Sequence, residues 1–361
     1  MTNTFSQKYK LYTGKRLNWL QLILLLGNSV VVDILPWIVF FASYSFVLTV
    51  IYYLFKIPVL IPKNNAISTL LLVFNLGLPS LLIFRTNTAN ERFWEARKLW
   101  GDLVNVIRNL TRDICIVVQD KSSQSKKEKE KILLLIVAFA ITMKLHLRSE
   151  QVNDEIISLV TTKQFYKLKY DSDHPPLQIA YWIGDYLQLK SDRNCVHIYQ
   201  LVALHSLVDN LVDILGGCER ILKTPQPIIY TLVLRKLIVI YCLLLPLEVI
   251  QDFRGFTIII ITFVSTILLG IEQIGSQLEQ PFAHHPNALP LDLICDTILL
   301  NVQELIEQTN KNNIGTPCHG NGHDPELIKP PNHSEGHIDK GQKKQITLKE
   351  LLALSDNDYF N

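Results

Sequence analysis

The histidines and cysteines are the side chains of this chain best suited to bind a metal or to take part in catalysis. His197 and His205 lie eight residues apart within one expected helix, a spacing that helix packing also explains. Cys318, His319 and His323 form a loose group in a polar stretch, which is a weak signal for metal binding. The chain has no HExxH or GxSxG motif and no paired-carboxylate signature. We therefore expect no catalytic site, no metal site and no cofactor.

A different kind of chemistry is indicated by residues 81–103, where a charge-free run changes abruptly into a charged, aromatic segment. The segment reads LLIFRTNTANERFWEARKLWGDL, and its charges begin at Arg85. A helix in a soluble core rarely changes character in this way. A membrane helix that continues into the cytosol does so naturally, because the surrounding solvent changes from lipid to water.

The composition suggests a membrane part joined to a sizeable aqueous part. Hydrophobic residues make up 48% of the 361 residues and charged residues only 19%, and the mean hydropathy is +0.19. The net charge of +2 indicates no nucleic-acid partner. The six cysteines are scattered without a CxxC pair, which favours reduced thiols over a disulfide framework.

Two charge-free runs are long enough to cross a bilayer, a third run is long enough but contains charges, and a fourth is slightly shorter. Residues 34–55 and 64–84 contain no charge, and a spanning helix needs about 20 such residues. Residues 225–250 are apolar but interrupted by Arg235, Lys236 and Glu248, which must then face protein or water. Residues 255–271 are again free of charge. We expect four membrane helices in an all-α protein.

The distribution of lysine and arginine predicts that both ends of the chain lie in the cytosol. A basic N-terminus leads into the first hairpin, and the basic region after it returns to the cytosolic side. The expected divisions are an interfacial N-terminal helix in 1–33, a first transmembrane hairpin in 34–84, a cytosolic helical domain in 85–224, a second transmembrane hairpin in 225–275, a cytosolic helical segment in 276–307, and a disordered tail with one short amphipathic helix in 308–361.

Four stretches resemble the bestrophin family of ion channels, and they occur in the family's order. They are GNSVVVDILP at 27–36, FRTNTANERFWEARKLWG at 84–101, CERILKTPQPIIYTLVLRKLIVIYCLLLP at 218–246 and EQPFAHHPNALPLDLIC at 279–295. With their spacing they cover roughly residues 17–305 and are more similar to the bacterial, algal and plant branch than to the animal one. The resemblance implies a homopentamer in a lipid bilayer, with helical subunits around one central pore.

In this family the second membrane helix lines a narrow apolar neck, and Leu76, Ser80 and Phe84 occupy the corresponding positions. Their i, i+4 and i+8 spacing places them on one face of a helix. A ring of apolar side chains gates by dewetting and passes ions when it widens. Ser80 departs from the large apolar residue of many relatives, which predicts a neck that wets more easily. The alternative is that this face packs against a neighbouring helix.

The same resemblance places Arg85 and Asn87 just below the neck, where they could contact ions. A guanidinium raises the local concentration of anions, and an amide can donate to a partly dehydrated anion. The alternative for Arg85 is an ion pair with Glu91 or with a neighbouring subunit. We expect the nearby charged residues to form structural salt bridges in the vestibule wall: Glu91, Arg92, Glu95, Arg97 and Lys98.

Asp292 and Asp296 fall where animal relatives carry a calcium-binding acidic run. Two carboxylates four residues apart provide too few oxygens for Ca²⁺, which takes 6–8 oxygen ligands. We therefore predict no calcium site here, with Asp292 capping a helix or forming a pair.

The sequence, with the resemblance it carries, predicts a pentameric channel for small monovalent anions such as chloride or bicarbonate, and not an enzyme. The alternatives are a Na⁺-conducting channel of the same fold and a membrane scaffold that does not conduct. Arg85 favours anions, whereas rings of Glu91, Asp209 or Asp213 would favour cations. The expected location is a bacterial plasma membrane, with a plastid membrane as the alternative.

Overall fold

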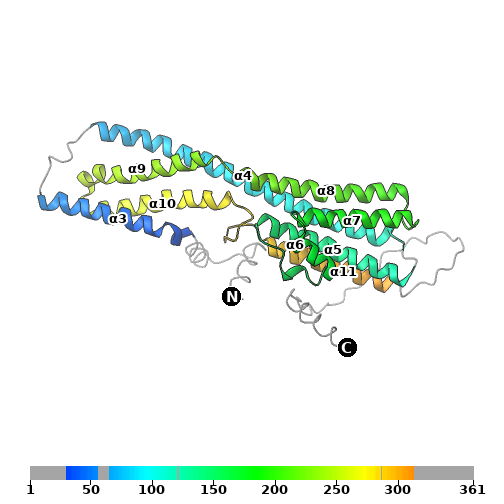
Figure 1. Ribbon diagram of the computed structural model, residues 1–361. Helices are drawn as coiled ribbons and strands as arrows, with labels where there is room; N and C mark the ends of the chain where they lie inside the picture. The colour runs from blue at the N-terminus through cyan, green and yellow to red at the C-terminus, as the bar shows by residue number, and fades with distance from the viewer. Residues whose placement is uncertain (1–29, 56–64, 120–121, 286, 313–361) are drawn as a thin grey trace, which may run out of the picture. The chain divides into compact units, whose positions relative to one another are not determined.

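The computed structural model describes residues 30–55, 65–119, 122–285 and 287–312, and every regular element in these ranges is a helix (Figure 1). The prediction of an all-α protein is therefore confirmed for the described part of the chain. The α-helices are α3 (Val30–Phe55), α4 (Asn65–Val117), α5 (Ser123–Leu147), α6 (Thr162–Tyr170), α7 (Pro175–Asp192), α8 (Ile198–Lys223), α9 (Ile228–Phe253), α10 (Thr257–Leu278) and α11 (Leu291–Asn312). Two short 3-10 helices lie at Asp154–Ile156 and Arg254–Phe256.

Five of the described helices are long and apolar enough to cross a membrane, by length and composition alone. Four of them, in α3, α4, α9 and α10, correspond to the predicted membrane helices and have a mean hydropathy of 2.0 to 2.2. The fifth is α8, whose value is 1.4. Helix α8 carries Asp209, Asp213 and Glu219, and such charges are unfavourable in lipid. We therefore keep the prediction that α8 lies on the cytosolic side.

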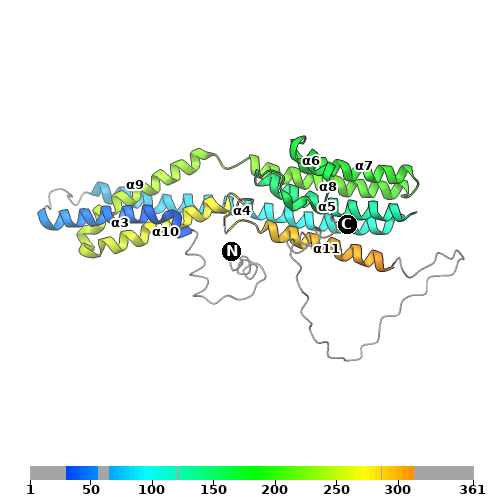
Figure 2. The same cartoon turned by 60° about the horizontal axis from the view of Figure 1, so that its bottom comes forward.

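The described residues divide into two compact units. Of the described residues, those in 30–103 and 213–293 form the first unit, and those in 104–212 and 294–312 form the second. In the first unit α10 packs against both α3 and α9, as the two views show (Figures 1 and 2). Its core joins four helices through the buried side chains of Phe41, Leu78, Leu82, Leu234, Ile238, Cys242 and Ile261.

The helix α4 runs without interruption from Asn65 to Val117, and so passes through the predicted boundary at residue 84. Pro79 lies inside it and has no N–H to donate to the preceding turn. Next to it, the Ser80 hydroxyl donates to the carbonyl oxygen of Leu76 at 3.0 Å. A serine that bonds the preceding turn is a known cause of helix bending, so both residues weaken the rigidity of α4 at this point.

The core of the second unit is α5, whose residues from Ile132 to Leu147 are almost all buried. This burial fits its sequence, because a helix that is apolar on every side must be surrounded by protein. Against α5 packs α7, which in turn contacts α6 (Figure 2). Ser122 caps α5 and Thr161 caps α6, the latter through a reciprocal capping box with Gln164.

The last described helix, α11, continues to Asn312, beyond residue 307 where the sequence placed the start of the disordered tail. The predicted helical segment is therefore too short at its C-terminal end. The predicted amphipathic helix of the tail lies outside the described residues, as do the interfacial N-terminal helix and the group formed by Cys318, His319 and His323.

Candidate ion pathway

One side of α4 in the first unit is packed against the rest of the chain. The buried residues on this side include Leu71, Leu78, Leu82, Ala89, Ala96 and Trp100. Successive residues of a helix point about 100° apart, so these positions share one face. Small alanines on this face let neighbouring helices approach closely, and Leu78 and Leu82 join the core of the first unit.

The opposite side of α4 carries a row of exposed residues, which we call the α4 stripe. Its members are Leu76, Ser80, Phe84, Asn87, Glu91, Trp94, Lys98 and Asp102. By the same helical geometry they fall within an arc of about 80°, centred roughly 180° from the packed side. The stripe is thus the part of the helix farthest from the protomer's own core, and its character changes from apolar to polar after Phe84.

The three predicted neck residues begin the α4 stripe. Leu76 is 71% exposed and Phe84 is 68% exposed, which are high values for large apolar side chains. Ser80 is exposed as well, although its hydroxyl is bonded to its own helix. These side chains are therefore free to meet a pore or another protomer, and their common face agrees with the i, i+4 and i+8 spacing.

Arg85, although next to Phe84 in the sequence, lies on the packed side of α4. Its side chain is only 1% exposed, and its guanidinium donates to Glu272 at 2.5 Å and to Glu279 at 3.3 Å. A side chain enclosed by its own protomer does not contact ions in a pathway, so the geometry speaks against that part of the prediction. The physical reason is the helical turn of about 100° between Phe84 and Arg85.

The partners of Arg85 come from α10 and the segment after it, not from Glu91 as the alternative prediction held. Glu272 also accepts a hydrogen bond from the Nε of Arg235 on α9, at 2.7 Å. Glu272 is buried, and it lies between the guanidinium groups of Arg85 and Arg235. A buried ion pair stabilises a fold only when its charges are well bonded, and this arrangement ties α4, α9 and α10 together.

Asn87 and Glu91 lie on the α4 stripe, one and two turns below Phe84, and both are exposed. Asn87 thus keeps the position that its predicted contact with ions requires. Glu91 was expected in a structural salt bridge, but its place on the stripe puts a carboxylate on the same side of the helix as the neck residues.

Two of the remaining predicted salt-bridge residues connect α4 to the end of α8, and a third is exposed. The guanidinium of Arg92 donates to the backbone carbonyls of Ile221 at 2.6 Å and Thr224 at 2.5 Å. It therefore caps the C-terminus of α8, where a cation also complements the helix dipole. Glu95 forms a salt bridge with Arg220 at 2.8 Å, and Arg97 is exposed.

Two of the three charges that interrupt α9 are bonded to protein groups, as a membrane helix requires. Arg235 pairs with Glu272, and Glu248 accepts a hydrogen bond from the hydroxyl of Ser68 on α4 at 2.7 Å. Lys236 is exposed, and its long side chain can reach the headgroup region from a helix end. These contacts agree with α9 as a spanning helix.

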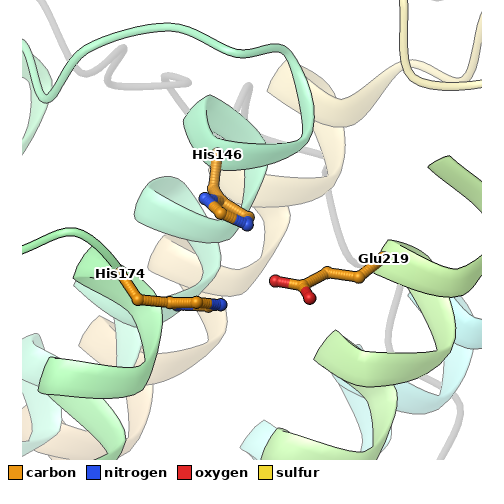
Figure 3. Close-up of side chains that lie close together, drawn as sticks. All are labelled: His146, His174 and Glu219. Carbon is orange, nitrogen blue, oxygen red and sulfur yellow. The ribbon is translucent and has the colours of Figure 1, made fainter. Parts of the chain in front are cut away.

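In the second unit the structure brings together two histidines that no sequence pattern relates. The rings of His146 on α5 and His174 before α7 have centroids 4.5 Å apart (Figure 3). The Nδ1 of His174 accepts from the backbone N–H of Leu177 and caps α7. Two imidazoles offer only half of the usual four-ligand zinc set. Glu219, also drawn in Figure 3, belongs to the first unit.

The two acidic residues considered for calcium lie on α11. Asp292 is in the first turn of this helix, where a carboxylate stabilises the positive end of the helix dipole. Asp296 follows one turn later and is partly buried. The absence of a calcium site remains a prediction, and the position of Asp292 fits the capping role proposed for it.

A family model described as "Bacterial/Fungal Bestrophin protein" matches residues 11–304. A voltage-dependent anion channel-forming protein of Nostoc sp. is 43% identical over 81% of this chain and 93% of its own length. One of the same description from Synechocystis sp. is 43% identical over 80% of this chain and 92% of its own length. The similarity therefore covers both units.

The solved structures that resemble this fold include a mutant of a bacterial Bestrophin homolog from Klebsiella pneumoniae. It superimposes with a TM-score of 0.68 and 25% sequence identity, covering 75% of this chain and 98% of that chain. The arrangement of helices is thus shared almost to the full length of that protein.

Proposed function

The chain belongs to the bacterial and fungal bestrophin family, and on that premise we propose that it forms a channel for small monovalent anions such as chloride or bicarbonate. The channel is a homopentamer in the plasma membrane of a bacterium, and its role is conduction and not catalysis. The names of the Nostoc and Synechocystis relatives support anions as the permeating ions.

The observation that carries this proposal is the α4 stripe. In a ring of identical subunits, the side of a helix that points away from its own protomer's core is the side available to face the central axis. The stripe is that side of α4, and it is exposed along its full length from Leu76 to Asp102. Five copies of α4 would then line a pathway that is apolar at Leu76 and Phe84 and polar below them.

The neck formed by Leu76, Ser80 and Phe84 acts in this proposal as a gate for water and ions. Apolar rings exclude water when they are narrow and admit hydrated ions when they widen. Ser80 interrupts the apolar surface with a hydroxyl, so the neck wets at a smaller radius than a fully apolar one. Because α4 is less rigid at Pro79 and Ser80, bending of the helix at this point can change the radius of the neck.

Below the neck, Asn87 offers amide donors to a passing anion, whereas Arg85 acts as a positioning residue. Arg85 holds α4 against α10 through Glu272 and Glu279, and so fixes the direction in which the stripe points. Its charge is balanced by these carboxylates, which leaves selectivity to residues on the stripe.

The experiment that tests this proposal is the reversal potential of purified protein in planar bilayers under a KCl gradient. The proposal predicts reversal near the chloride potential, with larger currents when Phe84 is replaced by alanine. Reversal near the potassium potential would replace the anion channel by a cation channel of the same fold. Silence of both the wild type and Phe84→Ala in every salt would leave a membrane scaffold as the explanation.

A further inference from the structure

Beyond the neck, the α4 stripe contains one indole and one ammonium group on successive turns. Trp94 is 55% exposed, and Lys98 is exposed four residues later on the same side of the helix. We propose that Trp94 and Lys98, repeated around the pore, form an anion-coordinating ring below the neck that determines charge selectivity. This inference rests on the proposed channel function and adds a second site to it.

The position of Trp94 is unusual for so large an apolar side chain. The nearby Trp100, which lies on the packed side of α4, is fully buried. The indole N–H can donate a hydrogen bond but cannot accept one. A ring of exposed indoles can therefore bond anions but cannot coordinate cations through that group. The same helix therefore uses one tryptophan for packing and presents the other to the pathway.

Lys98 supplies the charge that the indole lacks. Its ammonium group offers three donors and no acceptor. Lys98 was expected in a structural salt bridge, but among the described residues no ion pair is found for it, whereas Glu95, three residues earlier, is paired with Arg220. Asp102 follows Lys98 at i+4, and this order of charges is the weaker one for an intrahelical pair. The ammonium of Lys98 is thus available to ions.

Glu91 opposes this ring from the turn above. It lies seven residues before Lys98, which corresponds to a rise of about 10 Å along the helix. At physiological ionic strength this separation is close to the screening length of about 8 Å, so the two charges act on an ion largely in succession. Glu91 then lowers the anion preference that Lys98 establishes, and their balance determines the selectivity.

The first test is quenching of tryptophan fluorescence by iodide and by neutral acrylamide in purified, detergent-solubilised protein. Trp94→Phe removes an iodide-sensitive component. Lys98→Gln lowers the iodide quenching of this Trp94 component by about twofold or more but leaves its quenching by acrylamide unchanged, because only the anion is attracted by the lysine charge. Arg97→Gln is the matched control, since its cation lies on the flank of α4 and not on the stripe.

The second test is the chloride-to-potassium permeability ratio. Lys98→Gln and Trp94→Phe lower it, Glu91→Gln raises it, and Arg97→Gln changes it least. If the wild type passes anions but the Lys98 and Trp94 variants match it in both tests, the ring is wrong and the channel proposal stands. If the wild type lacks anion selectivity and Lys98→Gln leaves iodide quenching unaltered, both are wrong.

Discussion

The two sides of α4 contain similar kinds of residue but give them opposite roles. On the packed side, a cation (Arg85) and a tryptophan (Trp100) are almost fully buried. On the stripe, a cation (Lys98) and a tryptophan (Trp94) are exposed. The role of a residue in this helix therefore depends on its angle around the axis more than on its distance from the neck.

The largest expected effect comes from removing the buried cation of the packed side. Arg85→Ala leaves Glu279 without its cation and Glu272 with Arg235 alone. Removing one partner of a buried pair typically costs about 3–5 kcal/mol, so the detergent-solubilised protein should unfold at a clearly lower temperature or fail to assemble. Arg85→Lys should recover part of the loss, because the charge remains but the two-pronged geometry does not.

Lys98→Ala is the control for Arg85→Ala, because it removes a cation from the exposed side of the same helix. Its melting temperature should stay close to that of the wild type. Equal destabilisation by Arg85→Ala and Lys98→Ala would contradict the division of α4 into a packed and an exposed side.

The next effect concerns the neck on the stripe. Ser80→Leu should lower the single-channel current several-fold, because a third apolar ring narrows the neck and favours dewetting. Ser80→Ala, which removes the hydroxyl without adding bulk, should give a smaller reduction. Unchanged currents in the leucine variant would mean that this face of α4 packs against a neighbour and does not border the pathway.

A smaller effect is expected where α4 caps the end of α8. Arg92→Ala removes donors from the carbonyls of Ile221 and Thr224, which have little else to bond at a helix end. A loss of about 1–2 kcal/mol in the free energy of unfolding is typical for charged hydrogen bonds of this kind. Glu95→Ala should cost less, because its pair with Arg220 is largely exposed.

The smallest effect is expected at the buried lysine of the second unit, whose ion pair can be compared with that of Arg85 on α4. Lys190 donates to Glu128 at 2.9 Å, and this hydrogen bond holds the pKa of Glu128 below its usual value. A lowered pKa contributes stability above the ordinary value of 4.5 and loses it as the pH falls through the folded-state pKa.

Glu128→Gln should therefore be less stable than the wild type at neutral pH, and the difference in melting temperature should shrink below pH 4.5. The effect is modest because the Glu128 carboxylate is partly exposed and Lys190 also donates to the hydroxyl of Ser125. A difference that grows towards acid pH would show that this pair does not stabilise the fold.

The sequence predicted the membrane helices well because apolar length is a local property. The charge-free run from residue 34 ends with α3 at Phe55, and the run from 64 begins one residue before α4. The i, i+4 and i+8 spacing likewise predicted the shared face of the neck residues. These features depend only on neighbours in the chain.

What the sequence did not show is the set of contacts that join distant segments. Glu272 and Glu279 are 187 and 194 residues from Arg85, and no local pattern relates them. The helical phase of Arg85 relative to Leu78 and Leu82 was, however, a readable signal that it belongs to the packed side. The proximity of His146 and His174 similarly depends on how α5 packs with α7.

The position of the ion pathway can be tested by modifying introduced cysteines with a charged thiol reagent while current is recorded. Asn87→Cys lies on the α4 stripe, and Ala89→Cys lies on the packed side, where Ala89 is fully buried. If the α4 stripe lines the pathway, the reagent changes the current through the Asn87→Cys channel and leaves the Ala89→Cys channel and the wild type unaltered. Modification that alters current only at Ala89→Cys, or at neither position, would contradict the placement of the ion pathway along this stripe.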